Sequence, residues 1–337
     1  MANLNVIGNG FDLYHGLPTS YYYFACYLLS HNEDLYDDWA DMYGFSKGII
    51  HMPFEEFERK IDNLGYWSDF EKKLGELSSE WVEGTLLDDL DLENPEAVEL
   101  EVDRPNHVLT MKRMLNAWIR ETVDLEKNYR IVSAMIGSRK ISFSDNDSFV
   151  SFNYTHTLEQ IYARHNVFHI HGKSSSEEDH ELIIGHGNDA VIEELEKNID
   201  ELREYDFEQP ANNRIQEFRF EIDVLKELRK PVSQCISKLV AFLNNMEEPE
   251  FICVYGLSLG KVDIPYLEAI KRKWPNCTWK FSYYAETDKD RIREVTQTLS
   301  IPMEQYEIFE FKNENSSEIE CRIVEENHIT QWPILSR

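Results

Sequence analysis

The chain begins with a short apolar run, Leu4 to Ile7, that leads directly into Gly8-Asn9-Gly10-Phe11-Asp12 and then into a segment with helical spacing. A strand that turns through glycines into a helix gathers backbone N–H groups at the positive end of that helix, which suits an anionic phosphate. The third glycine of the dinucleotide fingerprint is missing, because Leu13 stands in its place. The unit therefore predicts the first strand and helix of an α/β sheet, with either a nucleotide site or a tight turn that has no ligand.

Short runs rich in β-branched and aromatic residues recur along the chain, and long segments with helical spacing separate them. The predicted strands lie near residues 3–8, 148–152, 167–171, 182–185, 251–256 and 278–284. Most strand positions are apolar instead of alternating, as expected where helices cover both faces of a sheet. We therefore predict an α/β fold with a doubly wound, mostly parallel, Rossmann-like sheet.

Two intervals are too long to be simple crossovers between strands. Residues of about 20–140 carry amphipathic runs such as Phe54 to Ile61, and the acidic stretch from Asp88 to Pro105 interrupts them. The interval of about 189–248 is charged and has helical spacing. We predict that both intervals are helical insertions on a single α/β domain spanning 1–337, and that the stretch from Asp88 to Pro105 is a mobile loop.

The charge balance is strongly acidic, because 63 Asp and Glu stand against 34 Lys and Arg and the formal net charge is −29. Such a field repels phosphate backbones and disfavours nucleic-acid binding over the bulk surface. The five cysteines include no Cys-x-x-Cys pair, so neither a disulfide framework nor a structural zinc site is encoded. The first residues lack the basic and long apolar regions of a signal peptide, and no window reaches eighteen apolar residues, so we expect neither a signal peptide nor a membrane span. We expect a cytoplasmic protein that does not enter membranes.

Four segments place small or polar residues directly after predicted strands, where a doubly wound sheet binds its ligands. They are Gly8 to Asp12, Phe152-Asn153-Tyr154-Thr155, His169-Ile170-His171-Gly172, and Gly256 to Gly260 followed by Asp263. Each alone is compatible with an ordinary polar loop. Together they predict one shared site at the carboxyl ends of the strands.

The same segments resemble two known patterns. The set is similar to the sirtuin-like NAD-binding fold of bacterial antiviral proteins, which has a glycine turn, an Asn-Tyr-Asp-type motif, a His-Gly motif and a late Gly-x-Ser-x-x-Asp-type motif. From residue 3 to about 265 the chain resembles, more specifically, the AbiH family, which is associated with abortive infection against bacteriophage. The motifs that carry this resemblance are Asn5 to Leu13 with His15-Gly16 and Thr19-Ser20, Trp67 to Glu71, Ser151 to Thr155, and Ile184 to Gly187.

The resemblance implies an antiviral effector that binds NAD as substrate or ligand; as an enzyme it would hydrolyse NAD to nicotinamide and ADP-ribose. It implies that Asn153 orients the nicotinamide ribose and that His171 is the general base, roles that suit a reaction in which positive charge builds on the ribose. The resemblance suggests that Asp69 and Glu71 turn toward the cleft, although the sequence leaves their role open. No metal is expected, because no cysteine pair has the spacing of metal ligands. The implied cofactor-binding residues are Gly8, Asn9, Gly10, Phe11, Asp12, Ser258 and Asp263.

The sequence also departs from the sirtuin-like pattern. Thr155 stands where that pattern has an acid, which favours one alternative, a non-catalytic nucleotide-binding sensor that uses the same cleft. The four-cysteine zinc ribbon of true sirtuins is absent, which disfavours protein deacylation. A second alternative is a metal-dependent phosphoesterase or nuclease with ligands from His169, His171, His186, Asp12 and Asp189.

His169 and His171 share one face of the predicted strand at 167–171, and we expect His169 to pack in the core and not to react. The sequence leaves open the phage trigger, a partner protein and a homo-oligomer.

Overall fold

The computed structural model describes residues 2–42, 74–75, 105–176, 182–187, 189–204 and 209–329. Three features singled out from the sequence lie outside these residues: the run Phe54 to Ile61, the segment with Asp69 and Glu71, and the stretch from Asp88 up to Pro105. The expected orientation of Asp69 and Glu71 therefore stays a prediction.

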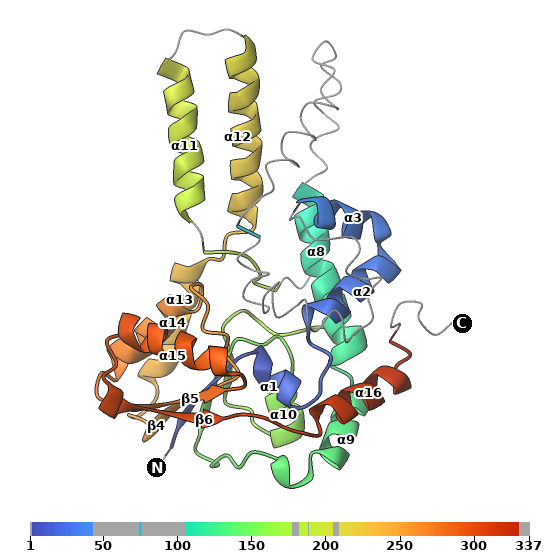
Figure 1. Ribbon diagram of the computed structural model, residues 1–337, viewed down its shortest axis with the longest axis vertical. Helices are drawn as coiled ribbons and strands as arrows, with labels where there is room; N and C mark the ends of the chain where they lie inside the picture. Colours follow the sequence, from blue (N-terminus) through green and yellow to red (C-terminus); the bar gives the residue numbers. More distant parts are fainter. Residues whose placement is uncertain are drawn as a thin grey trace.

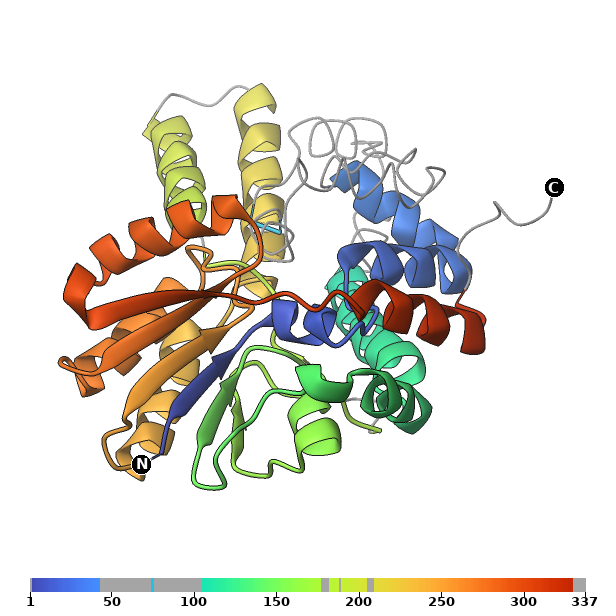
Figure 2. The ribbon, with the colours of Figure 1, turned by 60° about the horizontal axis from the view of Figure 1, so that its bottom comes forward.

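A six-stranded parallel sheet forms the centre of the described structure, in the order β3-β2-β1-β4-β5-β6. Its strands are β1 (Leu4–Ile7), β2 (Ser148–Ser151), β3 (Val167–His169), β4 (Phe251–Tyr255), β5 (Thr278–Tyr283) and β6 (Tyr306–Glu310). Strands β2 and β3 are added in turn on one side of β1, and β4, β5 and β6 are then added in turn on its other side. This order is that of the doubly wound dinucleotide-binding fold, whose ligands bind where the winding reverses. The predicted fold class is confirmed, and the reversal lies between β1 and β4 (Figure 2).

Helices cover both faces of the sheet because successive strand residues point to opposite sides and both sides are apolar. Ile7 and Phe149 pack into a core with the first group of helices, whereas Val6 and Val254 pack into a core with the second. Among the described helices, none is both long enough and apolar enough to cross a membrane. The first group comprises α1 (Asn9–Tyr14), α2 (Tyr21–His31), α3 (Glu33–Met42), α8 (Pro105–Trp118), η3 (Ile119–Val123), α9 (Glu126–Met135), α10 (Thr157–Tyr162) and α16 (Ser316–Glu326); the second comprises α13 (Val232–Asn244), α14 (Ile264–Lys273) and α15 (Glu286–Thr298).

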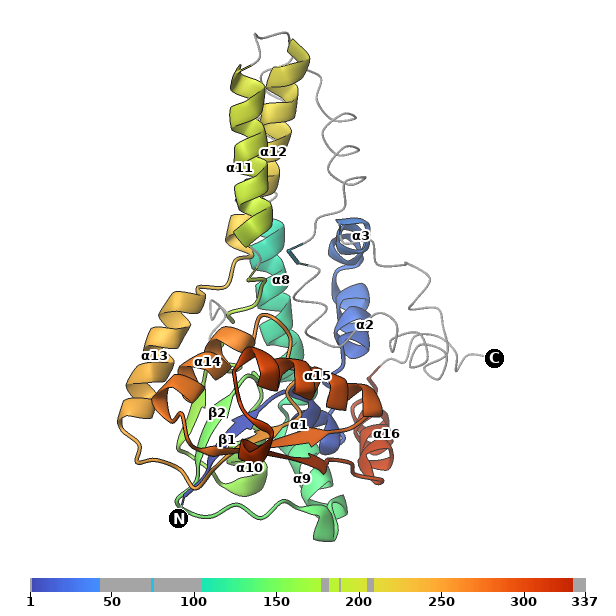
Figure 3. The ribbon, with the colours of Figure 1, turned by 60° about the vertical axis from the view of Figure 1, so that its left-hand side comes forward.

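Helices α11 (Asp189–Glu204) and α12 (Gln209–Glu227) form a hairpin that projects away from the sheet (Figures 1 and 3). Apolar residues such as Leu195 and Leu225 bury a small core of their own between the two helices. Helix α13 also falls in the predicted insertion at 189–248, but its Leu239 and Leu243 pack into the core of the sheet. The projecting part of that interval therefore ends before α13.

The predicted strand at 182–185 is wrong. Leu182 and Ile184 are buried, but this segment forms no ladder with the sheet. Gly185 has a φ of +146°, and a Cβ at that position would lie 1.7 Å from the carbonyl oxygen of Leu228. The segment is apolar because it packs beneath the end of α12, so burial without strand pairing explains its composition.

Two other parts of the sheet differ from the sequence prediction. The strand expected at 167–171 ends at His169, and Ile170 and His171 belong to the turn that follows it. His171 is therefore not on a strand face shared with His169. Strand β6 was missed because Glu307 and Glu310 interrupt its apolar pattern, as an edge strand with partly exposed faces allows.

Close packing of two loops explains the glycines at the reversal point. Gly256 has a φ of +59°, and a Cβ there would lie 2.4 Å from the carbonyl carbon of Gly10 and 2.4 Å from the nitrogen of Phe11. A Cβ on Gly8 would lie 2.5 Å from the Cα of Leu257. The loops after β1 and β4 thus touch through their backbones, a contact that side chains would prevent.

We expect Gly256→Ala to lower the free energy of unfolding by more than Gly137→Ala does. Gly137 has a φ of +54°, but a Cβ added there would meet no atom within 4 Å, so its substitution isolates the cost of left-handed backbone, about 1–2 kcal/mol. Gly256→Ala adds steric overlap worth about 1–3 kcal/mol more. Urea unfolding of the two variants measures the difference, and equal midpoints would contradict the close-packing explanation.

Candidate functional site

The reversal point of the sheet is closed by hydrogen bonds between the loops after β1 and β4. The N–H of Gly8 donates to the carbonyl oxygen of Tyr255 at 2.9 Å, and the N–H of Gly10 donates to that of Gly256 at 2.8 Å. The sequence pattern predicts that these glycines offer their N–H groups to phosphate. In this structure both groups already have a partner within the protein.

Asn153 brings a side-chain amide from β2 to the same point. Its Nδ2 donates to the carbonyl oxygen of Gly8 at 3.0 Å, across 145 residues of sequence. Its backbone N–H donates to the Ser151 hydroxyl oxygen at 3.1 Å. The sheet thus places Asn153 beside the glycine turn, as expected of strand ends that meet at one edge.

The side chains of Asn9 and Phe11 both make contacts within the protein. The Asn9 amide donates to the carbonyl oxygen of Thr19 at 3.1 Å. The Phe11 ring is fully buried and lies 4.6 Å from the His15 ring and 5.9 Å from the Tyr162 ring, measured between centroids. The Phe11 side chain belongs to the core, so only its backbone remains for the expected contact with a cofactor.

Asp12 lies in the first turn of α1, and its carboxyl group is completely buried. Thr155 donates to its Oδ2 at 2.7 Å, and Thr157 donates to its Oδ1 at 2.6 Å. Burial raises the pKa of Asp12 to about 7, although both hydroxyl donors and Asn153 oppose that rise. An acid at position 155 would place a second carboxylate beside Asp12. The threonine that departs from the sirtuin-like pattern is therefore a partner for an acid supplied by α1.

His171 lies in the turn after β3, enclosed by aromatic rings. Its ring centroid is 5.6 Å from that of Phe152 and 5.6 Å from that of Tyr266, and its Nε2 lies 3.4 Å from the Tyr266 hydroxyl. Burial lowers its pKa well below the usual value, and the charge of Lys230 adds to the effect. The imidazole is therefore neutral near pH 7, the form that can accept a proton, but only 3% of the residue is exposed.

The side chain of His169 is only 7% exposed, and each of its ring nitrogens lies beside an acceptor. Its Nδ1 lies 3.0 Å from the carbonyl oxygen of Asn153, and its Nε2 lies 3.0 Å from Oε1 of Glu159. Lys173 reaches the same Glu159 oxygen at 3.7 Å. His169 thus packs against the backbone of Asn153 and the carboxylate of Glu159, and its expected lack of a reactive role stays a prediction.

Ser258 and Asp263 lie in the loop between β4 and α14. The Ser258 hydroxyl donates to Oδ2 of Asp263 at 3.4 Å, and the Asp263 carbonyl accepts the N–H of Tyr266 at 3.1 Å. This loop therefore connects the reversal point to the ring that contacts His171. The roles of Ser258 and Asp263 toward an adenosine ribose stay predictions.

The alternative metal site is not assembled in the part of the chain that the structure describes. His186 bonds the carbonyl oxygen of Leu225, and Asp189 pairs with Arg229 at 2.6 Å, both near α12. His169, His171 and Asp12 each have the separate partners described above. Within the described ranges, no group of three or more His, Cys, Asp or Glu side chains is arranged to hold a metal ion.

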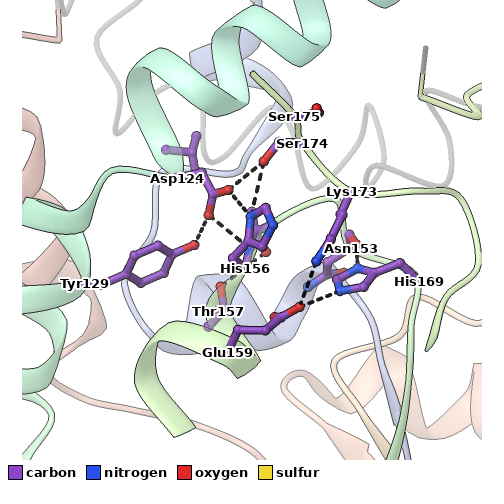
Figure 4. A network of polar contacts seen from close by, with 12 residues as sticks. Asp124, Tyr129, Asn153, His156, Thr157, Glu159, His169, Lys173, Ser174 and Ser175 are labelled. Carbon is purple, nitrogen blue, oxygen red and sulfur yellow. Dashed lines mark hydrogen bonds and ion pairs between the residues drawn. The ribbon is translucent and has the colours of Figure 1, made fainter. Parts of the chain in front are cut away.

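A second polar cluster, which sequence reasoning missed, is centred on Asp124 and His156 (Figure 4). Asp124 ends η3, and His156 follows β2 immediately after Thr155. The Asp124 carboxylate bonds His156 Nδ1, and its Oδ1 accepts the backbone N–H of His156 at 2.9 Å. His156 lies directly after the Asn153-Tyr154-Thr155 motif and directly before α10, and this position was a detectable signal. Nothing in the sequence marked Asp124 as its partner.

Comparison with known proteins gives one match. The family model described as bacteriophage abortive infection AbiH matches residues 4–283. No curated protein and no solved structure matches the chain. The matched range includes every strand but β6 and every candidate site residue named above.

Proposed function

The chain belongs to the bacteriophage abortive infection AbiH family, and we propose that it acts in the cytoplasm as an abortive-infection effector that binds NAD and hydrolyses it to nicotinamide and ADP-ribose. The family membership supports the abortive-infection role. NAD binding and hydrolysis are the further steps that we infer from the geometry.

One observation carries the proposal: the Asn153 amide meets the glycine turn where the winding of the sheet reverses, 3.0 Å from the carbonyl oxygen of Gly8. Doubly wound sheets bind nucleotides at this place. A side-chain amide there has both a donor and an acceptor for the hydroxyl groups of a ribose. His171 follows the neighbouring strand β3, so a second polar side chain comes to the same edge of the sheet.

The proposed reaction requires a water molecule in addition to the side chains of Asn153 and His171. Water adds to the anomeric carbon of the nicotinamide ribose while the C–N bond breaks, and the bonding electron pair leaves with neutral nicotinamide. A proton of the water passes to Nε2 of His171. Because burial holds the pKa of His171 well below its usual value, the acceptor is unprotonated at neutral pH.

A nucleotide-binding sensor is the second candidate function, and two specific observations favour it. The Gly8 and Gly10 N–H groups are engaged by the β4 loop, and the rings of Phe152 and Tyr266 enclose His171. A ligand that separated the two loops would expose these groups and change the conformation. A sensor needs this movement but no proton transfer.

Incubating the purified full-length chain with NAD separates the two functions. Chromatography measures nicotinamide release, and calorimetry measures NAD binding in the same preparation. Release of nicotinamide with turnover supports the enzyme. Binding without release favours the sensor, and the absence of both contradicts the NAD proposal. In infected cells, growth arrest with unchanged total NAD would contradict the hydrolytic function.

A further inference from the structure

A polar pocket of about 250 Å³ lies beside the Asp124–His156 pair. It opens between η3, the start of α10 and the loop after β3. Its lining is almost entirely side chains that donate hydrogen bonds. The residues that line it are Arg120, Asp124, His156, Gln160, Ser174, Ser175 and Ser176.

The one acid in this lining has no capacity left for a ligand. Oδ1 of Asp124 accepts the Tyr129 hydroxyl and the His156 backbone N–H, and Oδ2 accepts His156 Nδ1 and the Ser174 hydroxyl. A carboxylate has about four lone-pair sites, and four protein donors occupy them. Burial opposes ionisation of Asp124, yet the bonds from His156, Ser174 and Tyr129 outweigh it and hold its pKa below the usual value.

Within the described part of the chain, both hydrogen bonds of the His156 ring are made by Nδ1. Because Asp124 holds Nδ1, Nε2 is the nitrogen that remains for a ligand, and 24% of the side chain is exposed. The hydrogen bond and charge of Asp124 raise the pKa of His156 above its usual value, against the opposing effect of burial. Nε2 therefore carries a proton over more of the physiological pH range than it does in a free histidine and acts as a charged donor.

The serine wall of the pocket is preformed. The Ser175 N–H donates to Oδ1 of Asn116 at 3.1 Å, and Nδ2 of Asn116 donates to the Ser175 carbonyl oxygen at 3.2 Å. The Ser174 N–H donates to the carbonyl oxygen of Tyr154 at 2.7 Å. Buried Asn116 thus fixes the loop after β3 in one position, so little ordering is needed when a ligand binds.

Arg120 supplies a positive charge to the lining of the pocket. One of its guanidinium nitrogens bonds Glu121, whose other carboxylate oxygen accepts the Tyr27 hydroxyl at 2.9 Å. Among the described residues the guanidinium makes no further hydrogen bond, and the side chain is 36% exposed. A planar guanidinium held in this way presents N–H groups that suit a phosphate.

We infer that this pocket binds the phosphate group of a ligand through the guanidinium of Arg120 and the imidazole of His156. The inference does not depend on NAD hydrolysis at the reversal point, because none of these residues takes part in that reaction. A free phosphate ion and the phosphate of a nucleotide share the required chemistry. The experiment separates these two sources.

Calorimetry of the full chain with inorganic phosphate at pH 6.5 tests the site. We expect saturable binding with a dissociation constant of roughly millimolar or tighter. Arg120→Gln and His156→Gln are each expected to weaken it roughly tenfold or more, because each removes a charge-assisted hydrogen bond. Arg130→Gln is the matched control, since Arg130 is 74% exposed, pairs with Glu126 on α9 and does not line the pocket. Its binding should equal that of the parent.

Sulfate titrations at several pH values isolate the histidine, because sulfate keeps its charge over that range. The charged groups that act on His156 are Asp124 from η3, Glu159 on α10 and Lys173 after β3. Arg120 lines the same pocket, and the His169 ring lies 6.4 Å from the His156 ring. Sulfate affinity should fall as the pH rises through the His156 pKa in the parent and change less in His156→Gln. Thermal unfolding checks that the variants are folded.

ADP-ribose added during the phosphate titration identifies the source of the phosphate. If ADP-ribose competes with inorganic phosphate, the pocket binds the phosphate of a nucleotide. If the two ligands bind independently, the pocket binds free phosphate. No saturable phosphate binding up to tens of millimolar, or equal binding in the parent and in the folded Arg120→Gln variant, would overturn the inference. NAD hydrolysis can fail or succeed without changing these readings.

Discussion

Replacing His171 by alanine is expected to lower the rate of nicotinamide release from NAD by about 10²–10⁴-fold, because removal of a general base typically costs that much. The expected pH profile is distinctive. Burial keeps the His171 pKa well below its usual value, so the base stays deprotonated and the rate should not fall between pH 8 and pH 6. Asn153→Ala is expected to cause a comparable loss through ribose positioning. Steady-state rates measured over that pH range check both results.

Two controls separate chemistry from packing at His171. Tyr266→Phe removes the hydroxyl 3.4 Å from Nε2 and keeps the ring, so the rate should stay within a few-fold of the parent. His169→Ala should cost less than His171→Ala, because His169 only supports the Asn153 carbonyl. If His171→Ala, His169→Ala and Asn153→Ala all lose the same amount of activity and all have lowered melting temperatures, the three residues have a structural role. Full phage defence in His171→Ala would reject the base.

Replacing Asp12 by asparagine is expected to remove a pH-dependent loss of stability of about 4 kcal/mol. The Asp12 pKa is about 7 in the fold, against 3.8 for an aspartate in water. Since the folded pKa is raised, the contribution of this group to stability is fully present below the unfolded pKa and is lost as the pH rises through 7. Roughly three-fifths of the loss falls between pH 5 and pH 8.

Urea unfolding of the parent and of Asp12→Asn at pH 5 and pH 8 measures this effect. The free energy of unfolding of the variant, relative to the parent, should rise between the two pH values by roughly 2–3 kcal/mol. Thr155 and Thr157 can rotate their hydroxyls to bond the amide, so the fold has a partner for the new side chain. Parallel stability profiles in the two proteins would show that Asp12 is not the titrating group.

Local patterns accounted for much of the fold. The apolar run Leu4–Ile7 and the glycines after it predicted a strand, a turn and a helix, and the runs near 148, 251 and 278 predicted three more strands, because hydrophobic spacing and turn residues act over short distances. The run at 182–185 failed because burial alone makes a segment apolar. Whether such a segment also pairs as a strand depends on the neighbour that it meets, here the end of α12 at Leu228.

The sequence by itself determined that the chain is a parallel α/β protein, that Gly8, Asn153 and Gly256 stand at strand ends, and that the family is AbiH. Only the tertiary structure decided which groups meet there. Asp124 lies 32 residues from His156, and Asp12 lies 143 residues from Thr155. Spacing along the chain specifies local conformation, whereas the partner of a buried charge is chosen by how remote elements pack, since a carboxylate removed from water must find its donors wherever the fold brings them.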